Sequence, residues 1–325
     1  MKHAREFFRI AIGALACAIA LGMSGTAYAQ GKPLRMVVPF GAGSLGDVLG
    51  RQIADVLTKR INAPVLVEPR AGAGGLVGAQ LVSRADPDGN TIMLTSGSVA
   101  SYHLLSASTD FDVRRDLEPL SLSVEGPFGV YTSNATPANT LAEFLAYAKA
   151  RPGKLNYGSA GVGSSVHTQG ELFLSAAGID LVHVPYNNTP ALLTALATND
   201  IQALAIDVGT ARAFTDGGRV RLLATGGAQR SSLYPNVPTT NEAGMPGFRT
   251  GFWYGFFAPP KTSRAILDAQ SALLSSILRD SEVTPRFQAQ GHTTTGSTAD
   301  QLRQRINEDI VGLEKLVKNG KLTKQ

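Results

Sequence analysis

Short apolar runs alternate along the chain with stretches in which apolar residues recur every three or four positions. The first three runs, typical of buried strands, are at 34–39, 65–67 and 91–95. Between the first two, Leu49, Ile53 and Leu57 recur on one face of a helix predicted over 47–61. Strands separated by helices predict an α/β fold with mostly parallel sheets flanked by helices.

The same alternation restarts in the middle of the chain. Further strands are expected at 154–157, 181–185, 201–206, 220–224 and 252–258, and further helices at 141–150, 165–177, 190–198, 262–279, 283–290 and 298–319. Thr140 and Glu143 have the spacing of a capping box, and Gly178 is placed to end the second of these helices. We therefore predict two lobes, with 30–127 and 231–325 in lobe one and 128–230 in lobe two. The chain is expected to cross between them near 124–131 and 225–248.

The first thirty residues have the pattern of a secretory signal peptide. Lys2, Arg5 and Arg9 precede an apolar stretch over 10–23, and small residues stand before a predicted cleavage after Ala29. The apolar stretch is short for a membrane span of about 20 residues. We therefore expect residues 1–29 to be removed and the protein to function in the periplasm.

Composition excludes several classes of protein. Hydrophobic residues make up 43% of the 325 residues, which is enough for packed cores. The formal charge of +5 is spread along the chain, so nucleic acid is not an expected partner. The chain has one cysteine, Cys17, which excludes a disulfide framework. The five histidines show no metal-ligand spacing, and we expect no metal.

Two glycine-rich loops, at 39–47 and 157–165, each follow a predicted strand and open a predicted helix. Glycine allows the backbone to approach a ligand closely, and a helix start leaves N–H groups unpaired. Such a loop binds anions without a cationic side chain. If the two loops face each other from different lobes, they would hold one carboxylate between them.

The first loop also matches the dinucleotide fingerprint at Gly41, Gly43 and Gly46, with Glu68 at the end of the next strand. The export signal argues against this interpretation, because NAD is scarce outside the cytoplasm. A dinucleotide-binding enzyme is the alternative function, and we expect no cofactor.

A hydrolase triad of Ser164, His167 and Asp207 is a third interpretation. The sequence around Ser164 does not fit the G-x-S-x-G nucleophile turn, so we expect no enzyme.

In these and further motifs the chain resembles the Bug-type substrate-binding proteins of tripartite tricarboxylate transporters. The resemblance covers about 33–320 and rests on VVPFGAGSLGDVLGR at 37–51, RPGKLNYGSAGVGSSVH at 151–167 and YPNVPTTNEAGMPGF at 234–248, among others. It implies a two-lobed periplasmic-binding-protein fold of type II that closes over a small carboxylate. It also implies a monomer that works with a membrane permease, or an orphan receptor used for sensing.

The resemblance also implies the site. The family's first loop resembles P-P-G-G-x-x-D, whereas here the second proline is absent from 41–47. A frequent aspartate falls on Asp207, followed by Val208 where the family often has asparagine. The residues expected to bind ligand are Phe40, Ala42, Gly43, Ser44, Leu45, Gly46, Asp47, Ser96, Gly97, Ser159, Gly161, Gly163, Ser164, Ser165, His167 and Asp207.

Alternative roles stay open for several of these side chains. Asp47 either contacts the ligand or stabilises the start of its helix, and His167 either bonds the ligand or is structural. Asp207 either accepts a hydrogen bond from an ammonium or hydroxyl group of the ligand or caps a turn. Three aromatic residues are candidates either for the pocket wall or for the core: Tyr186, Trp253 and Tyr254.

Overall fold

The computed structural model describes residues 32–106, 109–320 and 322. The predicted signal peptide, residues 1–29, lies outside the described residues. Among the helices of the described part, none combines the length and the apolar composition needed to cross a lipid bilayer.

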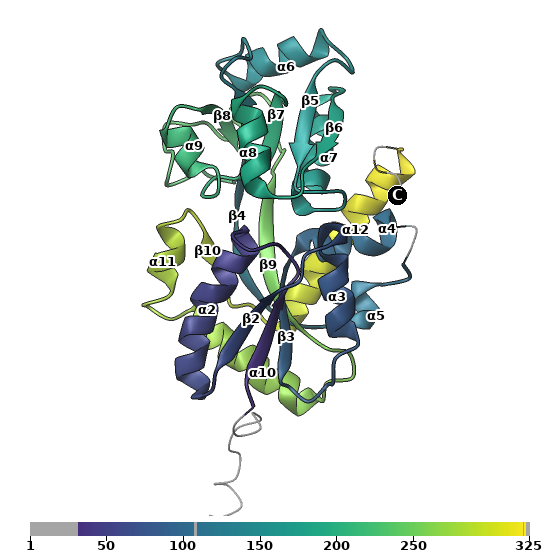
Figure 1. Ribbon diagram of the computed structural model, residues 1–325. Helices are drawn as coiled ribbons and strands as arrows, with labels where there is room; N and C mark the ends of the chain where they lie inside the picture. The colour runs from purple at the N-terminus through teal and green to yellow at the C-terminus, as the bar shows by residue number, and fades with distance from the viewer. Residues whose placement is uncertain (1–31, 107–108, 321, 323–325) are drawn as a thin grey trace, which may run out of the picture.

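The described chain folds into two lobes stacked end to end (Figure 1). In the lower lobe, β1 (Leu34–Val38) pairs in parallel with β2 (Val65–Pro69) and β3 (Thr91–Ser96), and β9 (Gly251–Ala258) runs antiparallel to β3. The helices that flank this sheet are α2 (Leu45–Ile61), α3 (Leu76–Ser83), α10 (Arg264–Leu278) and α12 (Ala299–Lys318). Its shorter elements are η1 (Ala73–Gly75), η2 (Gly97–Ala100), α4 (Tyr102–Leu105), α5 (Val113–Asp116), α11 (Thr284–Gln288) and β10 (Thr293–Thr294).

The upper lobe repeats this plan on a smaller scale. Its strands are β5 (Asn156–Ser159), β6 (Val182–Pro185), β7 (Ala203–Asp207) and β8 (Val220–Thr225). Its helices are α6 (Leu141–Lys149), α7 (Ser165–Ala177), α8 (Thr189–Ala197) and α9 (Arg212–Asp216). Strand β5 pairs in parallel with β6 and β7, as expected for strands joined by helical crossovers.

One long strand, β4 (Glu118–Ser133), runs through both lobes. Its first part pairs antiparallel with β9, up to Pro127 opposite Gly251, and its second part pairs antiparallel with β7 and β8. The α/β architecture with flanking helices agrees with the prediction. The parallel strand pairs lie within each lobe, whereas β4 and β9 add antiparallel pairs that the local pattern did not indicate. The boundaries between the lobes stay a prediction.

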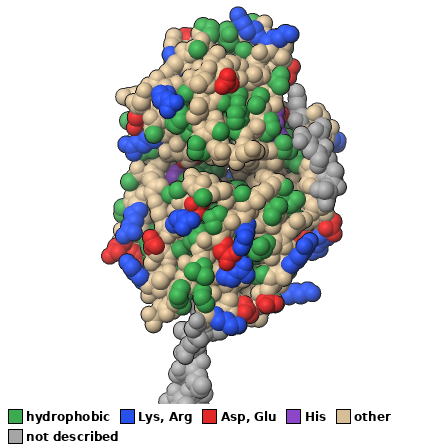
Figure 2. Space-filling model, in the orientation of Figure 1, with side chains coloured by type: hydrophobic (Ala, Val, Ile, Leu, Met, Phe, Trp, Pro, Cys, Tyr) green, Lys and Arg blue, Asp and Glu red, His purple; other side chains and the backbone are tan. Residues whose placement is uncertain are grey.

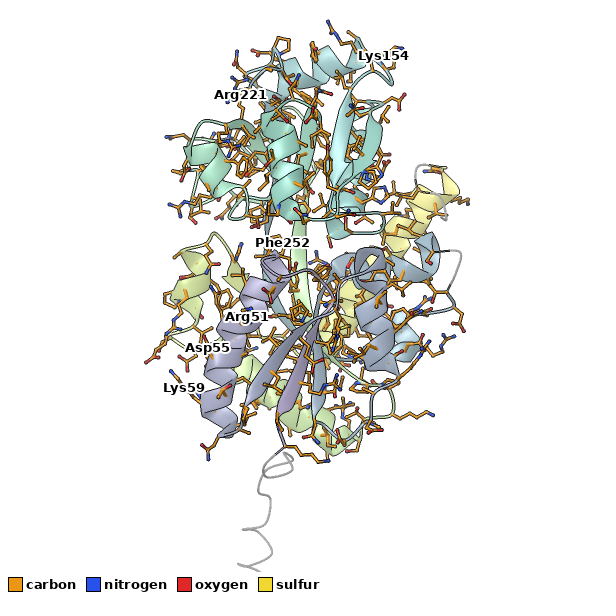
Figure 3. All side chains as sticks on the ribbon, in the orientation of Figure 1. Arg51, Asp55, Lys59, Lys154, Arg221 and Phe252 are labelled. Atoms are coloured by element: carbon orange, nitrogen blue, oxygen red, sulfur yellow. The ribbon has the colours of Figure 1, made fainter. Side chains whose placement is uncertain are left out.

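The sequence pattern explains the helices that position the loops. In α2 the stripe of Leu49, Ile53 and Leu57 is fully buried against β1 and α10, while the opposite face of the helix carries exposed charges. Figure 3 shows three of these, Arg51, Asp55 and Lys59, along the outer side of α2.

The caps of α6 and α7 follow from the sequence with one difference. The Thr140 hydroxyl accepts the N–H of Glu143 as predicted, but the Glu143 carboxylate accepts the N–H of Asn139 rather than that of Thr140. Helix α7 ends at Gly178 with φ of 62°, which is the left-handed conformation expected of a glycine cap.

Candidate functional site

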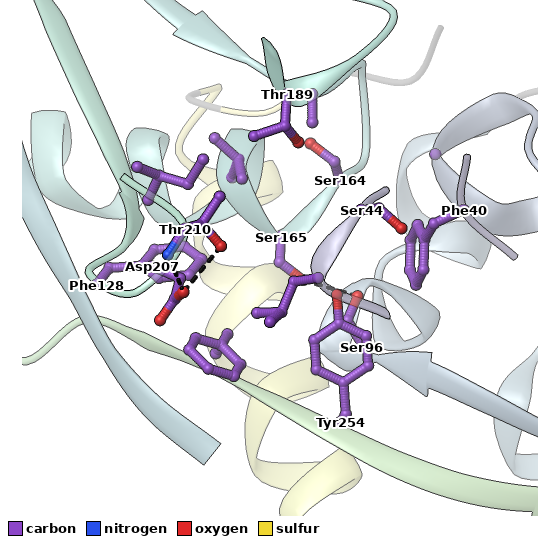
Figure 4. A pocket seen from close by; sticks show the side chains of 16 residues that line it. Phe40, Ser44, Ser96, Phe128, Ser164, Ser165, Thr189, Asp207, Thr210 and Tyr254 are labelled. Atoms are coloured by element: carbon purple, nitrogen blue, oxygen red, sulfur yellow. Dashed lines mark hydrogen bonds between the residues drawn. The ribbon is translucent and has the colours of Figure 1, made fainter. Parts of the chain in front are cut away.

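A crevice separates the two lobes and is visible as a furrow across the middle of the molecule (Figure 2). Its deep part is a cavity of about 100 Å³ lined by 16 residues, from both lobes (Figure 4). Its front part is larger, about 530 Å³, and adjoins the deep part, because the two share lining residues. These shared residues are Phe40, Ser44, Gly74, Ala160 and Thr189.

The structure places the predicted site residues in three groups. Those that line the deep cavity are Phe40, Ser44, Leu45, Ser96, Ser164, Ser165 and Asp207. Ala42 and Gly161 line the front crevice instead, and Gly97 lines a pocket at the back, beside Trp253. The residues that line none of these three spaces are Gly43, Gly46, Asp47, Ser159, Gly163 and His167.

The first loop is held in shape by its own side chains. Gly43 has a φ of 76°, in the left-handed region that glycine accepts readily. The N–H of Gly43 donates to Oδ2 of Asp47 at 3.0 Å, and the N–H of Asp47 donates to the hydroxyl of Ser44 at 3.3 Å. Oδ1 of Asp47 faces the Arg51 guanidinium at 3.0 Å. Asp47 is therefore a positioning residue for the loop in this structure.

The second loop has the same geometry with a different side chain. Gly163 also has a φ of 76°, and its N–H donates to Nδ1 of His167 at 3.1 Å. The N–H of His167 donates to the hydroxyl of Ser164, which caps α7 as Ser44 caps α2. His167 thus occupies the position of Asp47 and performs the same task.

The environment of His167 keeps its imidazole neutral. The ring is 6% exposed and stacks on His183, with 4.2 Å between the ring centroids. Burial, with a smaller contribution from His183, lowers the pKa of His167 from its usual 6.5 to about 4. A neutral Nδ1 without a proton is the form that accepts the Gly163 N–H.

These arrangements leave backbone donors for a ligand. Within the part of the chain that the structure describes, the N–H groups of Leu45, Ser165 and Val166 have no backbone or side-chain acceptor. All three residues line the deep cavity, in the first turns of α2 and α7. Unpaired N–H groups at the starts of two helices favour a negatively charged group between them.

Hydrogen bonds between the second glycine-rich loop and the lower lobe cross the crevice and hold the lobes together. The Ser165 hydroxyl donates to the hydroxyl of Ser96 at 3.0 Å (Figure 4), and the Ser101 hydroxyl contacts the carbonyl of Gly163 at 3.0 Å. Gly74 lies directly against the second loop: a Cβ atom there would be 2.6 Å from the carbonyl oxygen of Val162. The lobes therefore meet closely only because residue 74 has no side chain.

Gly74→Ala should hold the lobes apart and weaken ligand binding about tenfold or more, because the added methyl group collides with backbone across the crevice. Gly218→Ala is the matched control, since Gly218 has almost the same φ, 64° against 65°, and open space around it. Both variants should lose a similar amount of stability, about 1 kcal/mol. Calorimetric titration with thermal melts separates the two effects. Equal affinities in the two variants would contradict a steric role for Gly74.

Asp207 lies at the other end of the cavity from Ser44 (Figure 4). It ends β7, is 1% exposed, and its Oδ2 accepts the N–H and the hydroxyl of Thr210 at 2.7 and 2.8 Å. Its Oδ1 is 3.1 Å from Nε2 of His292, a buried residue of the lower lobe. Asp207 thus caps a turn and also presents its carboxylate to the cavity.

The side chains of the triad interpretation do not form a hydrogen-bonded chain. The Ser164 hydroxyl donates to the carbonyl of Gly161, and Nδ1 of His167 accepts from Gly163. Glu68, the acidic residue of the dinucleotide interpretation, forms ion pairs with Arg35 and Arg70. In the described residues, no group of three or more His, Cys, Asp or Glu side chains is arranged to hold a metal ion.

The three aromatic candidates have different positions. Tyr254 lines the deep cavity and Tyr186 the front crevice. Trp253 points the other way: it is 2% exposed, lines the back pocket and donates its Nε1–H to Asp309 at 2.6 Å. Burial raises the pKa of Asp309.

Sequence reasoning missed several lining residues. They are Gly74, Phe128, Ala160, Val166, Thr189, Ile206, Thr210 and Phe252. Phe252 lay in the predicted aromatic strand, and Thr189 and Thr210 follow strands, at the end where α/β proteins bind ligands. Phe128 reaches the cavity because β4 pairs it with Asp207, a contact that no local pattern indicates.

Known proteins resemble this chain over most of its length. The family model described as "Tripartite tricarboxylate transporter family receptor" matches residues 49–322. The protein BugT of Bordetella pertussis is 32% identical over 316 residues, which cover 95% of each chain. The solved periplasmic binding protein BugD is 27% identical, with a TM-score of 0.83 over 92% of this chain and all of BugD. The solved MatC of Rhodopseudomonas palustris with bound malate is 28% identical, with a TM-score of 0.82 over 89% of this chain and all of MatC.

Proposed function

The chain belongs to the tripartite tricarboxylate transporter receptor family, and on that premise we propose that it captures a small carboxylate outside the cytoplasm and delivers it to a membrane permease of that transporter type. The proposed role is that of a receptor rather than an enzyme. The permease partner and the periplasmic location belong to the proposal, and the description of BugD as a periplasmic binding protein supports the location.

The observation that carries the proposal is the pair of equivalent loops. Each loop combines a left-handed glycine, a serine cap and an unpaired N–H at a helix start, and the two loops come from different lobes. One carboxylate can accept hydrogen bonds from both, with charge-assisted bonds of about 1.5–3 kcal/mol each. The binding of malate by MatC is consistent with a carboxylate ligand.

Closure of the lobes provides the mechanism. A carboxylate bound to the N–H of Leu45 alone contacts one lobe. The N–H groups of Ser165 and Val166, which belong to the other lobe, come within hydrogen-bond distance of that same carboxylate only when the crevice is closed. A ligand stabilises the closed form by the contacts that it makes in that form alone. The proposed hinge is where β4 and β9 pass from one lobe to the other.

Isothermal titration of the purified protein tests the proposal. At least one acid among malate and a panel of monocarboxylates should give saturable binding heat with 1:1 stoichiometry. Native mass spectrometry of the purified protein should detect any ligand that co-purifies. NAD is the comparison ligand and should give no heat. Saturable binding of NAD with none of any carboxylate would reject the receptor function and favour the dinucleotide alternative.

A further inference from the structure

The floor of the deep cavity is a row of aromatic rings that runs from the first loop toward Asp207. Phe40 contacts Tyr254 edge-on at 6.0 Å, Tyr254 contacts Phe252 at 5.9 Å, and Phe252 contacts Phe128 at 5.8 Å between ring centroids. Phe252 lies between the lobes (Figure 3). Leu45, Val166 and Ile206 also line the cavity. The body of a ligand held here would contact mostly apolar surface, and ring edges favour an aromatic partner.

The cavity offers no cation to a second acidic group. Of the 16 lining residues, all within the described part of the chain, none is Lys, Arg or His, and Asp207 alone carries a formal charge. The backbone donors are at the other end, in the two loops. A ligand carboxylate placed beside Asp207 would be a buried charge next to a like charge, which is strongly unfavourable.

Asp207 retains its capacity to accept a hydrogen bond. A carboxylate has about four acceptor sites, and Thr210 and His292 occupy three of them. Nδ1 of His292 is buried and has no partner within the described residues. The remaining acceptor site of Asp207 is open to a hydrogen-bond donor on the ligand.

We infer that the ligand is a monocarboxylate with an apolar body and a hydrogen-bond donor, hydroxyl or ammonium, at the end away from its carboxylate. Its carboxylate binds the two loops, its body lies on the aromatic row, and its donor reaches Asp207. This inference rests on the proposed receptor function and narrows it, because it excludes ligands that carry a second carboxylate at that end.

Two matched series of acids test the inference by calorimetric titration. The ring series is 4-hydroxybenzoate, benzoate and terephthalate, and the chain series is 6-aminohexanoate, hexanoate and adipate. In each series the terminal group is in turn a donor, apolar and a carboxylate. The donor acid should bind about tenfold more tightly than the apolar acid, and the diacid most weakly. The series that binds more tightly shows whether the body of the ligand is aromatic or aliphatic, and we expect the ring series to bind more tightly.

Asp207→Asn tests the assigned partner. It should reduce the preference for the donor acid to threefold or less and should strengthen diacid binding at least tenfold. Asp180→Asn, which removes an exposed carboxylate from the same lobe, is the control and should preserve the wild-type order. A thermal melt of each variant identifies loss of folding. If Asp207→Asn does not fold, the order in which the wild-type protein binds the acids of each series still tests the inference.

The outcomes separate this inference from the proposed function. Tightest binding of a diacid by the wild-type protein would overturn the inference while leaving a carboxylate receptor in place. An unchanged order in folded Asp207→Asn would also overturn it. If no acid of either series binds at millimolar concentration, this inference fails. If malate and the panel of monocarboxylates also give no binding heat, the receptor function fails as well.

Discussion

Gly43→Val should reduce ligand affinity at least about 100-fold while the protein still folds cooperatively. A valine at a φ of 76° is strained by about 1–3 kcal/mol, although the added Cβ meets no atom within 4 Å. The loop can relieve this strain only by moving, which breaks the hydrogen bond from the Gly43 N–H to Asp47 and displaces the N–H of Leu45. Loss of one or two charge-assisted bonds, about 3 kcal/mol in all, corresponds to the stated change in affinity.

Gly218→Val is the control for Gly43→Val. Gly218 has a φ of 64° and open space around it, and it lies after α9, outside the residues that line the crevice. Both variants should show similar losses in thermal stability, and the control should retain wild-type affinity in titration calorimetry. Wild-type affinity in folded Gly43→Val would show that the first loop does not hold the ligand.

Acidification should destabilise the protein through His167. The pKa of His167 is about 4 in the folded protein and near 6.5 when unfolded, so folding favours the neutral ring. Above pH 6.5 neither the folded nor the unfolded state binds a proton at His167, and the contribution of this residue to the free energy of unfolding is fully present. As the pH falls from 6.5 to 4, the unfolded state takes up the proton first and the contribution is lost, up to about 3 kcal/mol. Below pH 4 no further loss arises from this residue.

His167→Gln removes the titrating ring while keeping a side-chain acceptor for the Gly163 N–H. Urea unfolding at pH 7 and at pH 4.5 should show a smaller difference between the two pH values in the variant than in the wild type. His183, whose pKa burial also lowers, contributes in the same direction, so His183→Gln is a useful parallel variant. An undiminished pH dependence in His167→Gln would contradict the assignment.

The fold was predictable wherever local pattern decides it. The caps at Thr140 and Gly178 and the buried stripe of α2 depend on residues within one helix, and the structure has them as predicted. Strand β4 was not predicted as one element, because Pro119, Gly126 and Pro127 interrupt the apolar pattern over Glu118–Ser133. Its partners β7, β8, β9 and β10 come from distant parts of the chain, and only tertiary pairing decides such contacts.

The candidate site was likewise predictable only where residues close in sequence decide it. Local motifs identified the two loops, but they did not tell loop-stabilising side chains from ligand-facing ones. Asp47 and His167 both follow their glycine by four residues, and this spacing directs them back onto the loop. Gly74 and Phe128 belong to the site through contacts across the crevice and across β4, which depend on how the lobes and strands meet.

Trp253 makes ligand capture measurable without any added label. It is the one tryptophan in the 325-residue sequence, and its pocket at the back of the crevice is formed by Thr168 and Gln169 from the upper lobe together with Asp309 from the lower lobe. We expect relative rotation of the lobes to change the polarity around this indole, because residues of both lobes surround it. Stopped-flow recording of its intrinsic fluorescence would therefore follow the kinetics of each binding event in the unmodified protein.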